Sequence, residues 1–174
     1  FFDAVADYKI RLAERIHQYF HPDMITSFDD VATERGLFMA PDIYRRLIKP
    51  SHKKVNDAIR QMGMIPAIHC CGKCEDVIQD FIEEGNVAWS SAQPINDLAG
   101  ILDKYGSQLT VIGGYDTNGK PAQPTATVEE MQAEVRRAID TYAPYGSYIF
   151  FGFMLVDSDN PDEVMKAMMP IFEE

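Results

Sequence analysis

Short apolar runs alternate with amphipathic segments along the whole chain, and this alternation constrains the fold more than any other sequence feature. Apolar residues at helical spacing predict helices at residues 3–20, at residues 41–63 with a kink at Pro50, and after each later strand. Five strands are predicted, at residues 24–28, 64–70, 87–91, 109–113 and 148–151. Helices that connect successive strands return the chain to the same edge of a sheet, so the strands should be parallel. We therefore expect an α/β protein.

Three helix starts carry capping signals. Asn96 is suited to cap the helix that contains Leu98. Thr127 and Glu130 have the spacing of a capping box, and Asn160 followed by a proline predicts the start of the last helix.

Two architectures fit five β-α units in a row: a doubly wound open sheet and a (β/α) barrel. The doubly wound sheet would be favoured by a phosphate-binding glycine pattern after a strand, but Gly113-Gly114 is followed by Tyr115-Asp116. Polar residues instead follow strand after strand, as an active site at the carboxyl ends of barrel strands requires. They are Asp29, Asp30, His69, Cys71, Ser90, Ser91, Gln93, Tyr115 and Asp116. We predict a parallel TIM-barrel type of fold, as a partial barrel of about five β-α units.

Length and composition limit the alternatives further. The 174 residues are expected to form a single domain, residues 1–174. With 16 Lys and Arg against 27 Asp and Glu, the net charge of −11 argues against nucleic acid or an anionic membrane as a partner. The apolar run Tyr148–Val156 is too short to span a bilayer. The three cysteines are clustered instead of spread as a disulfide framework, which favours a reducing, cytoplasmic location.

The segment from His69 to Cys74 carries the most specific chemistry. Residues two apart in a strand point to the same side, so His69 and Cys71 should project together while Cys70 faces the packed helices. Imidazole and thiolate are preferred zinc ligands. Cys74, expected in the first turn of the next helix, could supply a third sulfur with a pKa lowered by the helix N-terminus. The alternative is that the cysteines pack as small hydrophobic residues.

Other candidate residues allow two interpretations each. Asp29 and Asp30 could hold a cation or act as general acid and base, or they could accept hydrogen bonds from loop backbone. His17, His21 and His52 lie in helical contexts, where surface or capping roles are expected.

Several motifs together resemble the uroporphyrinogen decarboxylase superfamily, and its corrinoid-dependent methyltransferases in particular. The resemblance covers the chain from about residue 24 onward. It rests on residues 29–41, Tyr44, Ile48–Pro50, His52–Lys53, Gln93–Leu98 and Lys104–Gly106. The His69-x-Cys71-Gly72 motif is similar to the zinc motif of the methyltransferase branch.

The resemblance implies an enzyme that moves a methyl group between a corrinoid and a thiol or folate-type acceptor, with zinc bound by His69 and Cys71. The corrinoid would be carried by a partner protein. Asp29, Asp30, Gln93, Tyr115 and Asp116 would position the acceptor or orient the metal ligands.

Two departures from the family pattern stand out. Family methyltransferases have a further zinc-ligating cysteine after the last strand, whereas residues 150–155 contain none, so Cys74 or a carboxylate would replace it or the metal would be lost. Family barrels have eight strands, and five are predicted here. The chain is therefore expected to be the carboxyl-terminal portion of a barrel, completed by an amino-terminal half or by a second copy of itself.

Two rival functions remain open. One is uroporphyrinogen decarboxylation, which the zinc motif disfavours because true decarboxylases use no metal. The other is a degenerate half-barrel that serves as a binding or regulatory subunit.

Overall fold

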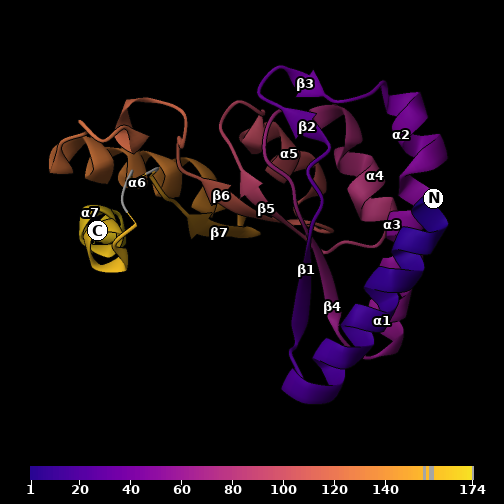
Figure 1. Ribbon diagram of the computed structural model, residues 1–174. Helices are drawn as coiled ribbons and strands as arrows, with labels where there is room; N and C mark the ends of the chain where they lie inside the picture. Colours follow the sequence, from indigo (N-terminus) through magenta and orange to yellow (C-terminus); the bar gives the residue numbers. More distant parts are fainter. Residues whose placement is uncertain (155, 157–158, 174) are drawn as a thin grey trace.

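The computed structural model describes residues 1–154, 156 and 159–173, and its centre is a five-stranded parallel sheet (Figure 1). The strands lie in the order β1-β4-β5-β6-β7. Their bounds are β1 (Met24–Phe28), β4 (Ile65–His69), β5 (Ala88–Ala92), β6 (Thr110–Gly114) and β7 (Tyr148–Phe151). All five predicted strands are confirmed, and no bound differs from its prediction by more than one residue.

The strand order separates the two architectures. Each strand of the sheet pairs in parallel with the strand that precedes it in the sheet, and the order does not reverse at any point. A doubly wound sheet would reverse its order at a switch point. The sheet also turns progressively from β1 to β7 (Figure 1), as the wall of a barrel does. The described strands thus form part of a barrel-like wall that is not closed.

Helices connect the strands and cover the sheet. Their bounds are α1 (Phe2–Phe20), α2 (Pro41–Leu47), α3 (Lys49–Gln61), α4 (Ile78–Glu83), α5 (Leu98–Tyr105), α6 (Val128–Tyr142) and α7 (Pro161–Phe172). Short 3₁₀ helices lie at η1 (Glu75–Val77), η2 (Lys120–Ala122) and η3 (Ala143–Tyr145). The predicted kink is confirmed as a break at Ile48, with Pro50 in the first turn of α3. No helix of the described residues is both long and apolar enough to cross a membrane.

The capping predictions hold at two of three helices. Thr127 and Glu130 form the full capping box of α6, and Asn160 caps α7. The prediction for α5 was wrong, because Asp97 is its N-cap and accepts a hydrogen bond from Gly100 N at 3.0 Å. The Asn96 side chain instead holds the preceding loop, as described below.

One small element was not predicted. Residues 29–40 contain an antiparallel pair, β2 (Ala32–Thr33) and β3 (Gly36–Leu37), which follows directly after β1. Strands of two residues leave no alternation of polar and apolar side chains to detect.

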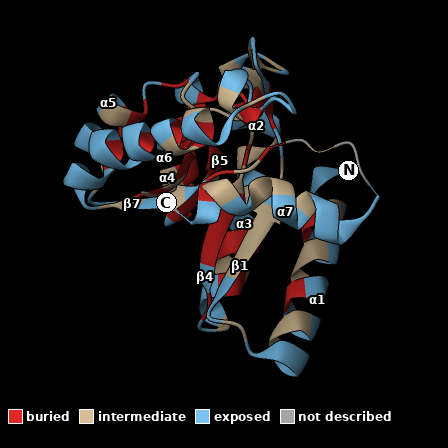
Figure 2. Cartoon of the chain, turned by 90° about the vertical axis from the view of Figure 1, so that its left-hand side faces the viewer, coloured by how far each residue is buried: buried red, intermediate tan, exposed pale blue. Residues whose placement is uncertain are grey.

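Three groups of buried apolar side chains stabilise the fold. The main group joins β4, β5 and β6 to α2, α4 and α5, and includes the fully buried Trp89, Tyr44 and Phe81. A second lies around α6 and α7, and a third joins α1 to α3. Figure 2 shows β4 as largely buried, whereas β1 at the edge of the sheet is less so.

The edges of the sheet are partly apolar and open. β1 and β7 each lack a second neighbour among the described strands. Phe28 on β1 and Ile149 and Phe151 on β7 are exposed. Unpaired strand edges with exposed apolar side chains favour association with further strands.

A β-bulge interrupts the pairing of β5 with β6. Ser90 pairs with Ile112 and Ala92 with Gly113, so Ser91 is an extra residue, and its φ of 63° is in the left-handed region. Gly113 accommodates the bulge. At its φ of +150°, a Cβ atom would lie 2.3 Å from the carbonyl oxygen of Ala92.

We predict that Gly113→Ala lowers the free energy of unfolding by at least about 3 kcal/mol, because backbone atoms must move to admit the methyl group. Gly63→Ala is the matched control, since Gly63 also has a positive φ but nothing lies within 4 Å of the added Cβ. Its cost should be about 1–2 kcal/mol. Urea unfolding measures the loss of unfolding free energy in both variants, provided that the m-values stay unchanged. Equal losses in the two variants would contradict the role given to Gly113.

Candidate metal site

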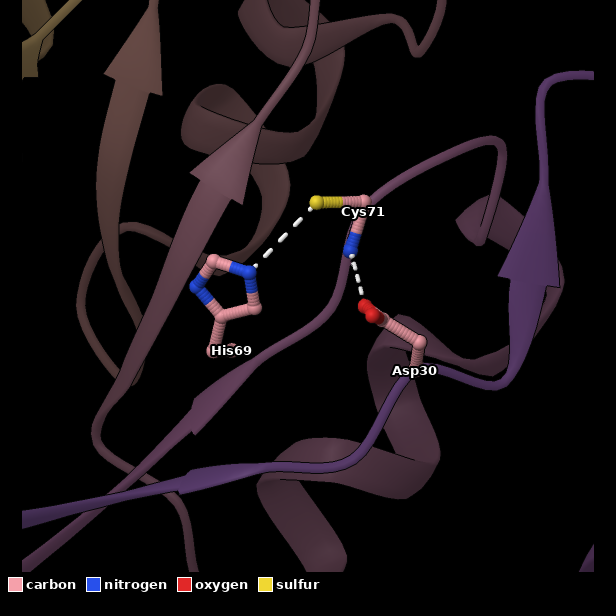
Figure 3. Close-up of side chains that lie close together, drawn as sticks. All are labelled: Asp30, His69 and Cys71. Carbon is pink, nitrogen blue, oxygen red and sulfur yellow. Dashed lines mark hydrogen bonds between the residues drawn. The ribbon is translucent and has the colours of Figure 1, made fainter. Parts of the chain in front are cut away.

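Side chains from two neighbouring strands meet at the carboxyl end of the sheet. Phe28 pairs with His69, and Asp29 N donates a hydrogen bond to His69 O at 3.2 Å. The residues that follow β1 and β4 therefore lie side by side. One ligand atom each from Asp30, His69 and Cys71 lies within 4.8 Å of the other two (Figure 3). No other group of three such residues was found among the described side chains.

The predicted common direction of His69 and Cys71 is confirmed. Cys71 Sγ lies 3.4 Å from His69 Nε2, on the same side of the chain. The other ring nitrogen, Nδ1, lies 3.2 Å from Ser90 Oγ, and Phe28 stacks on the ring with centroids 4.3 Å apart. These contacts hold the imidazole with Nε2 toward the sulfur.

Backbone contacts position the loop that carries Cys71. Cys71 N donates to Asp30 Oδ1 at 2.7 Å, and Lys73 N donates to Thr33 O at 2.8 Å. Gly72 has a φ of +84°, and a Cβ there would lie 2.6 Å from Thr33 O. The hairpin of β2 and β3 thus packs against this loop so closely that only glycine fits at position 72.

Two polar side chains from the next strand end complete the support of the loop. The buried Gln93 accepts a hydrogen bond from Gly72 N at 2.7 Å and donates to Thr117 Oγ1 at 2.6 Å. Asn96 accepts from Cys74 N and donates to Gly72 O, both at 2.9 Å. Gln93, predicted as a site residue, therefore acts through the backbone that carries Cys71.

The bulge in β5 gives the site a further contact. It places Ser91 Oγ 3.0 Å from Cys71 Sγ. Ser91 is one of two described non-glycine residues with positive φ. Strained conformations and bulges often lie next to functional sites, where they aim a side chain. Ser91 appears among the predicted polar strand ends, but its contact with the sulfur depends on a bulge that no sequence signal marks.

Burial favours the neutral form of two of the candidate ligands, His69 and Cys71. It lowers the pKa of His69, against the opposing effect of the Asp30 carboxylate. Burial also raises the pKa of the Cys71 thiol, which the Ser91 hydroxyl lowers and the Asp30 charge raises further. At neutral pH the imidazole is therefore in the form that binds metals, whereas the thiol must lose a proton.

Imidazole, thiolate and carboxylate are all zinc ligands, so the donor set of Asp30, His69 and Cys71 suits a zinc ion. Zinc bonds of about 2.0–2.3 Å at tetrahedral angles place ligand atoms about 3.3–3.8 Å apart. The separation of 3.4 Å between Cys71 Sγ and His69 Nε2 lies in this range. Asp30 is exposed, so its carboxylate has room to adjust. Asp30, which follows the first strand, thus offers a carboxylate as a third ligand in place of the cysteine that the resemblance led us to expect after the last strand.

Cys74 lies elsewhere. It precedes η1, and both Cys74 and Cys70 are fully buried within the main apolar group. The predicted lowering of its pKa was wrong: a hydrogen bond with Cys70 and burial raise the pKa of Cys74 well above its ordinary value. The structure does not bring Cys74 into the group formed by Asp30, His69 and Cys71.

Asp29 is not part of this group. Its carboxylate forms an ion pair with Lys9 and lies 4.0 Å from His52 Nε2. The two aspartates therefore have different partners, although both line the same cavity.

Tyr115 and Asp116 have structural contacts in the loop after β6. Tyr115 is buried in the second apolar group and donates to Pro121 O at 2.8 Å, and burial raises its pKa to about 12. Asp116 Oδ1 accepts from the backbone N–H groups of Asn118 and Gly119. Neither residue has a described contact with Asp30, His69 or Cys71.

Two cavities adjoin the site. A groove of about 420 Å³ is lined by Cys71 together with Thr33, Glu34, Gln93 and Asn118. A second cavity, of about 290 Å³, is lined by Asp30 and by residues of α1 and α3. The described residues that line these two cavities include no arginine.

The fold is shared with a known enzyme. The structure superposes on a methyltransferase from Methanosarcina mazei with a TM-score of 0.70 and 20% sequence identity. The match covers 97% of this chain and 46% of the other, so the chain spans about half the length of that protein. At this identity the similarity shows a common fold. No protein-family model and no curated protein sequence matches the chain.

We predict that the two neighbours of Cys71 change its reactivity in opposite directions. Asp30→Asn removes a charge that raises the pKa of the thiol, so metal-free protein should react with iodoacetamide at pH 8 about threefold faster. Ser91→Ala removes a hydrogen bond that lowers this pKa, so the reaction should slow by a similar factor. Fragment ions in tandem mass spectrometry distinguish label on Cys71 from label on the adjacent Cys70 and on Cys74, both of which are buried. The same direction of change in both variants would contradict this account.

Proposed function

We propose that the chain is part of a zinc-dependent methyltransferase, which moves a methyl group between a corrinoid carried by a partner protein and a small acceptor. The observation that carries this proposal is the group formed by Asp30, His69 and Cys71 at the carboxyl ends of parallel strands. The fold shared with a methyltransferase and the resemblance of the His69-x-Cys71-Gly72 motif to the family's zinc motif support it.

In this proposal three residues hold the metal and leave a fourth position for the acceptor. His69 supplies Nε2, Cys71 its sulfur and Asp30 a carboxylate oxygen. Zinc bound there would lower the pKa of an acceptor thiol, so that thiolate predominates near neutral pH. Ser90 orients the imidazole, and Gln93 and Asn96 hold the backbone of the Cys71 loop.

Decarboxylation of a porphyrinogen is the less favoured alternative. Its substrate carries several carboxylates, which arginine side chains bind best. The absence of arginine from the described lining of both cavities argues for the methyltransferase.

The proposal also concerns the strands that would complete the barrel and the compartment in which the enzyme works. The open edges at β1 and β7 would be covered by further barrel strands, from another part of a longer polypeptide or from a second copy of the chain. Free thiols at Cys70, Cys71 and Cys74 suit the reducing cytoplasm.

Zinc content is the first test. Protein purified without chelator should contain close to one zinc ion per chain. Cys71→Ala and His69→Gln should lose it, and Asp30→Asn should weaken zinc binding by about 10- to 100-fold. Cys74→Ala is the matched control and should keep the metal. Equal zinc loss in Cys74→Ala and Cys71→Ala would contradict the assigned ligands, and zinc-free wild-type protein that cannot be loaded would overturn the site.

Methyl transfer is the second test. Methylcobalamin as donor and 2-mercaptoethanol as acceptor give an anaerobic assay that is followed by the cobalamin spectrum. A thiol with the pKa of cysteine is only about 3% ionised at pH 7, and 2-mercaptoethanol is a weaker acid, so full ionisation at the metal should raise the rate at least about 30-fold over zinc-free protein. Cys71→Ala in the same zinc concentration is the control. A rate that is independent of zinc and of Cys71 would overturn the proposal.

A further inference from the structure

A serine hydroxyl lies against the sulfur of a candidate zinc ligand. Ser91 Oγ is 3.0 Å from Cys71 Sγ, and Ser91 is only 3% exposed. Among the described residues, this sulfur is the one hydrogen-bond partner of the hydroxyl. Cys71 is only half-buried and lines the groove of about 420 Å³, so small molecules can reach its sulfur from the side that Ser91 does not cover.

The backbone at Ser91 suits glycine better than serine. Its φ of 63° lies in the left-handed region, which glycine adopts freely and a residue with a Cβ atom adopts only at a cost. The bulge thus carries a side chain where the backbone disfavours one, and that side chain contacts Cys71. Backbone strain of this kind persists at functional sites, so the contact points to a function of the hydroxyl.

Zinc binding would fix the direction of this hydrogen bond. A cysteine that binds zinc is a thiolate without a proton, so the Ser91 hydroxyl must be the donor. His69 Nε2 lies 3.4 Å from the sulfur, but as a ligand it directs its lone pair at the metal and has no proton to donate. Among the described groups at this distance from the Cys71 sulfur, Ser91 is therefore the single donor.

A thiolate ligand can itself take the methyl group. In that side reaction Cys71 Sγ forms a bond to the methyl carbon, and the cobalt–carbon bond breaks with its electron pair going to cobalt. The product is S-methylcysteine, a thioether that lacks the charge with which a thiolate binds zinc, so the site would lose its metal. A hydrogen bond to the sulfur opposes this reaction, because the nucleophilicity of a thiolate falls with its basicity.

We propose that Ser91 protects Cys71 from methylation by donating a hydrogen bond to its sulfur, which directs the methyl group to the acceptor. This inference rests on the proposed function, in which the ligand thiolate and an acceptor thiolate lie on the same metal. A hydroxyl has one proton to donate, and the bulge in β5 holds Ser91 against the ligand sulfur. The acceptor sulfur does not share this hydrogen bond and is the better nucleophile of the two.

Methyl iodide tests this role in the zinc-loaded protein without any acceptor. Cys71 Sγ forms a bond to the methyl carbon, and the carbon–iodine bond breaks with its electron pair leaving as iodide. Ser91→Gly removes the hydroxyl and keeps the left-handed backbone, so it should bind zinc like the wild type and be methylated at Cys71 about three- to fivefold faster. Ser91→Ala should show the same increase, because the two variants share the loss of the hydroxyl. Tandem mass spectrometry locates the methyl group.

The same variants in metal-free protein distinguish the hydrogen bond from a loosened loop. Without zinc at pH 8, loss of the hydroxyl raises the pKa of the Cys71 thiol, so less thiolate is present and methylation should be slower than in the wild type. A loosened loop would speed the reaction in both states. Ser90→Ala is the matched control: its hydroxyl lies 3.2 Å from His69 Nδ1 and has no described contact with the sulfur, so no reversal between the two states is expected.

The outcomes separate this inference from the proposed function. Equal Cys71 methylation in zinc-loaded Ser91→Gly and wild type would overturn the inference and leave the proposed function intact. Loss of zinc from Ser91→Gly would also overturn it, since Ser91 would then act on metal binding. Faster methylation in this variant, with no transfer from methylcobalamin to 2-mercaptoethanol by the wild type, would support the protection and overturn the proposed activity. Wild-type protein that cannot be loaded with zinc would overturn both.

Discussion

The parallel pairing of β1 with β4 is the constraint on which the site depends. This pairing sets Phe28 opposite His69, so the residues that follow each strand emerge at the same level. Asp30 can then accept a hydrogen bond from Cys71 N while its carboxylate stays near the sulfur and the imidazole. A shift of this register by one residue would point β1 side chains to the opposite face and separate the three groups.

Around this pair, the remaining contacts limit the freedom of the Cys71 loop. The hairpin of β2 and β3 packs on Gly72, and Gln93 and Asn96 hold the loop backbone from the next unit of the sheet. The bulge at Ser91 adds a hydroxyl beside the sulfur. Each of these contacts holds the loop backbone or orients a side chain. The positions of the candidate ligands are thus fixed without further charged groups in a partly buried place.

Sequence patterns predicted what depends on local periodicity. The five strands, the break before Pro50 and the common direction of His69 and Cys71 follow from spacing along the chain, and the structure confirms them. The role of Asn96 was misjudged, because a capping residue and a residue that holds a neighbouring loop look alike in sequence. The environment of His52 could not be predicted, since Glu84 lies 32 positions away and meets it only through the packing of α3 against α4.

The order of the strands also has a consequence for how the chain reaches this structure. Each strand of the sheet pairs with the strand that precedes it along the sheet, so the sheet can grow one β-α unit at a time. The contacting residues of each new unit are then separated by only a short stretch of sequence. Asp30, His69, Cys71 and Ser91 all lie within the first three of these strands or directly after them. During synthesis from the ribosome, the groups of the candidate site would therefore meet as soon as β5 has paired, before the last two strands have emerged.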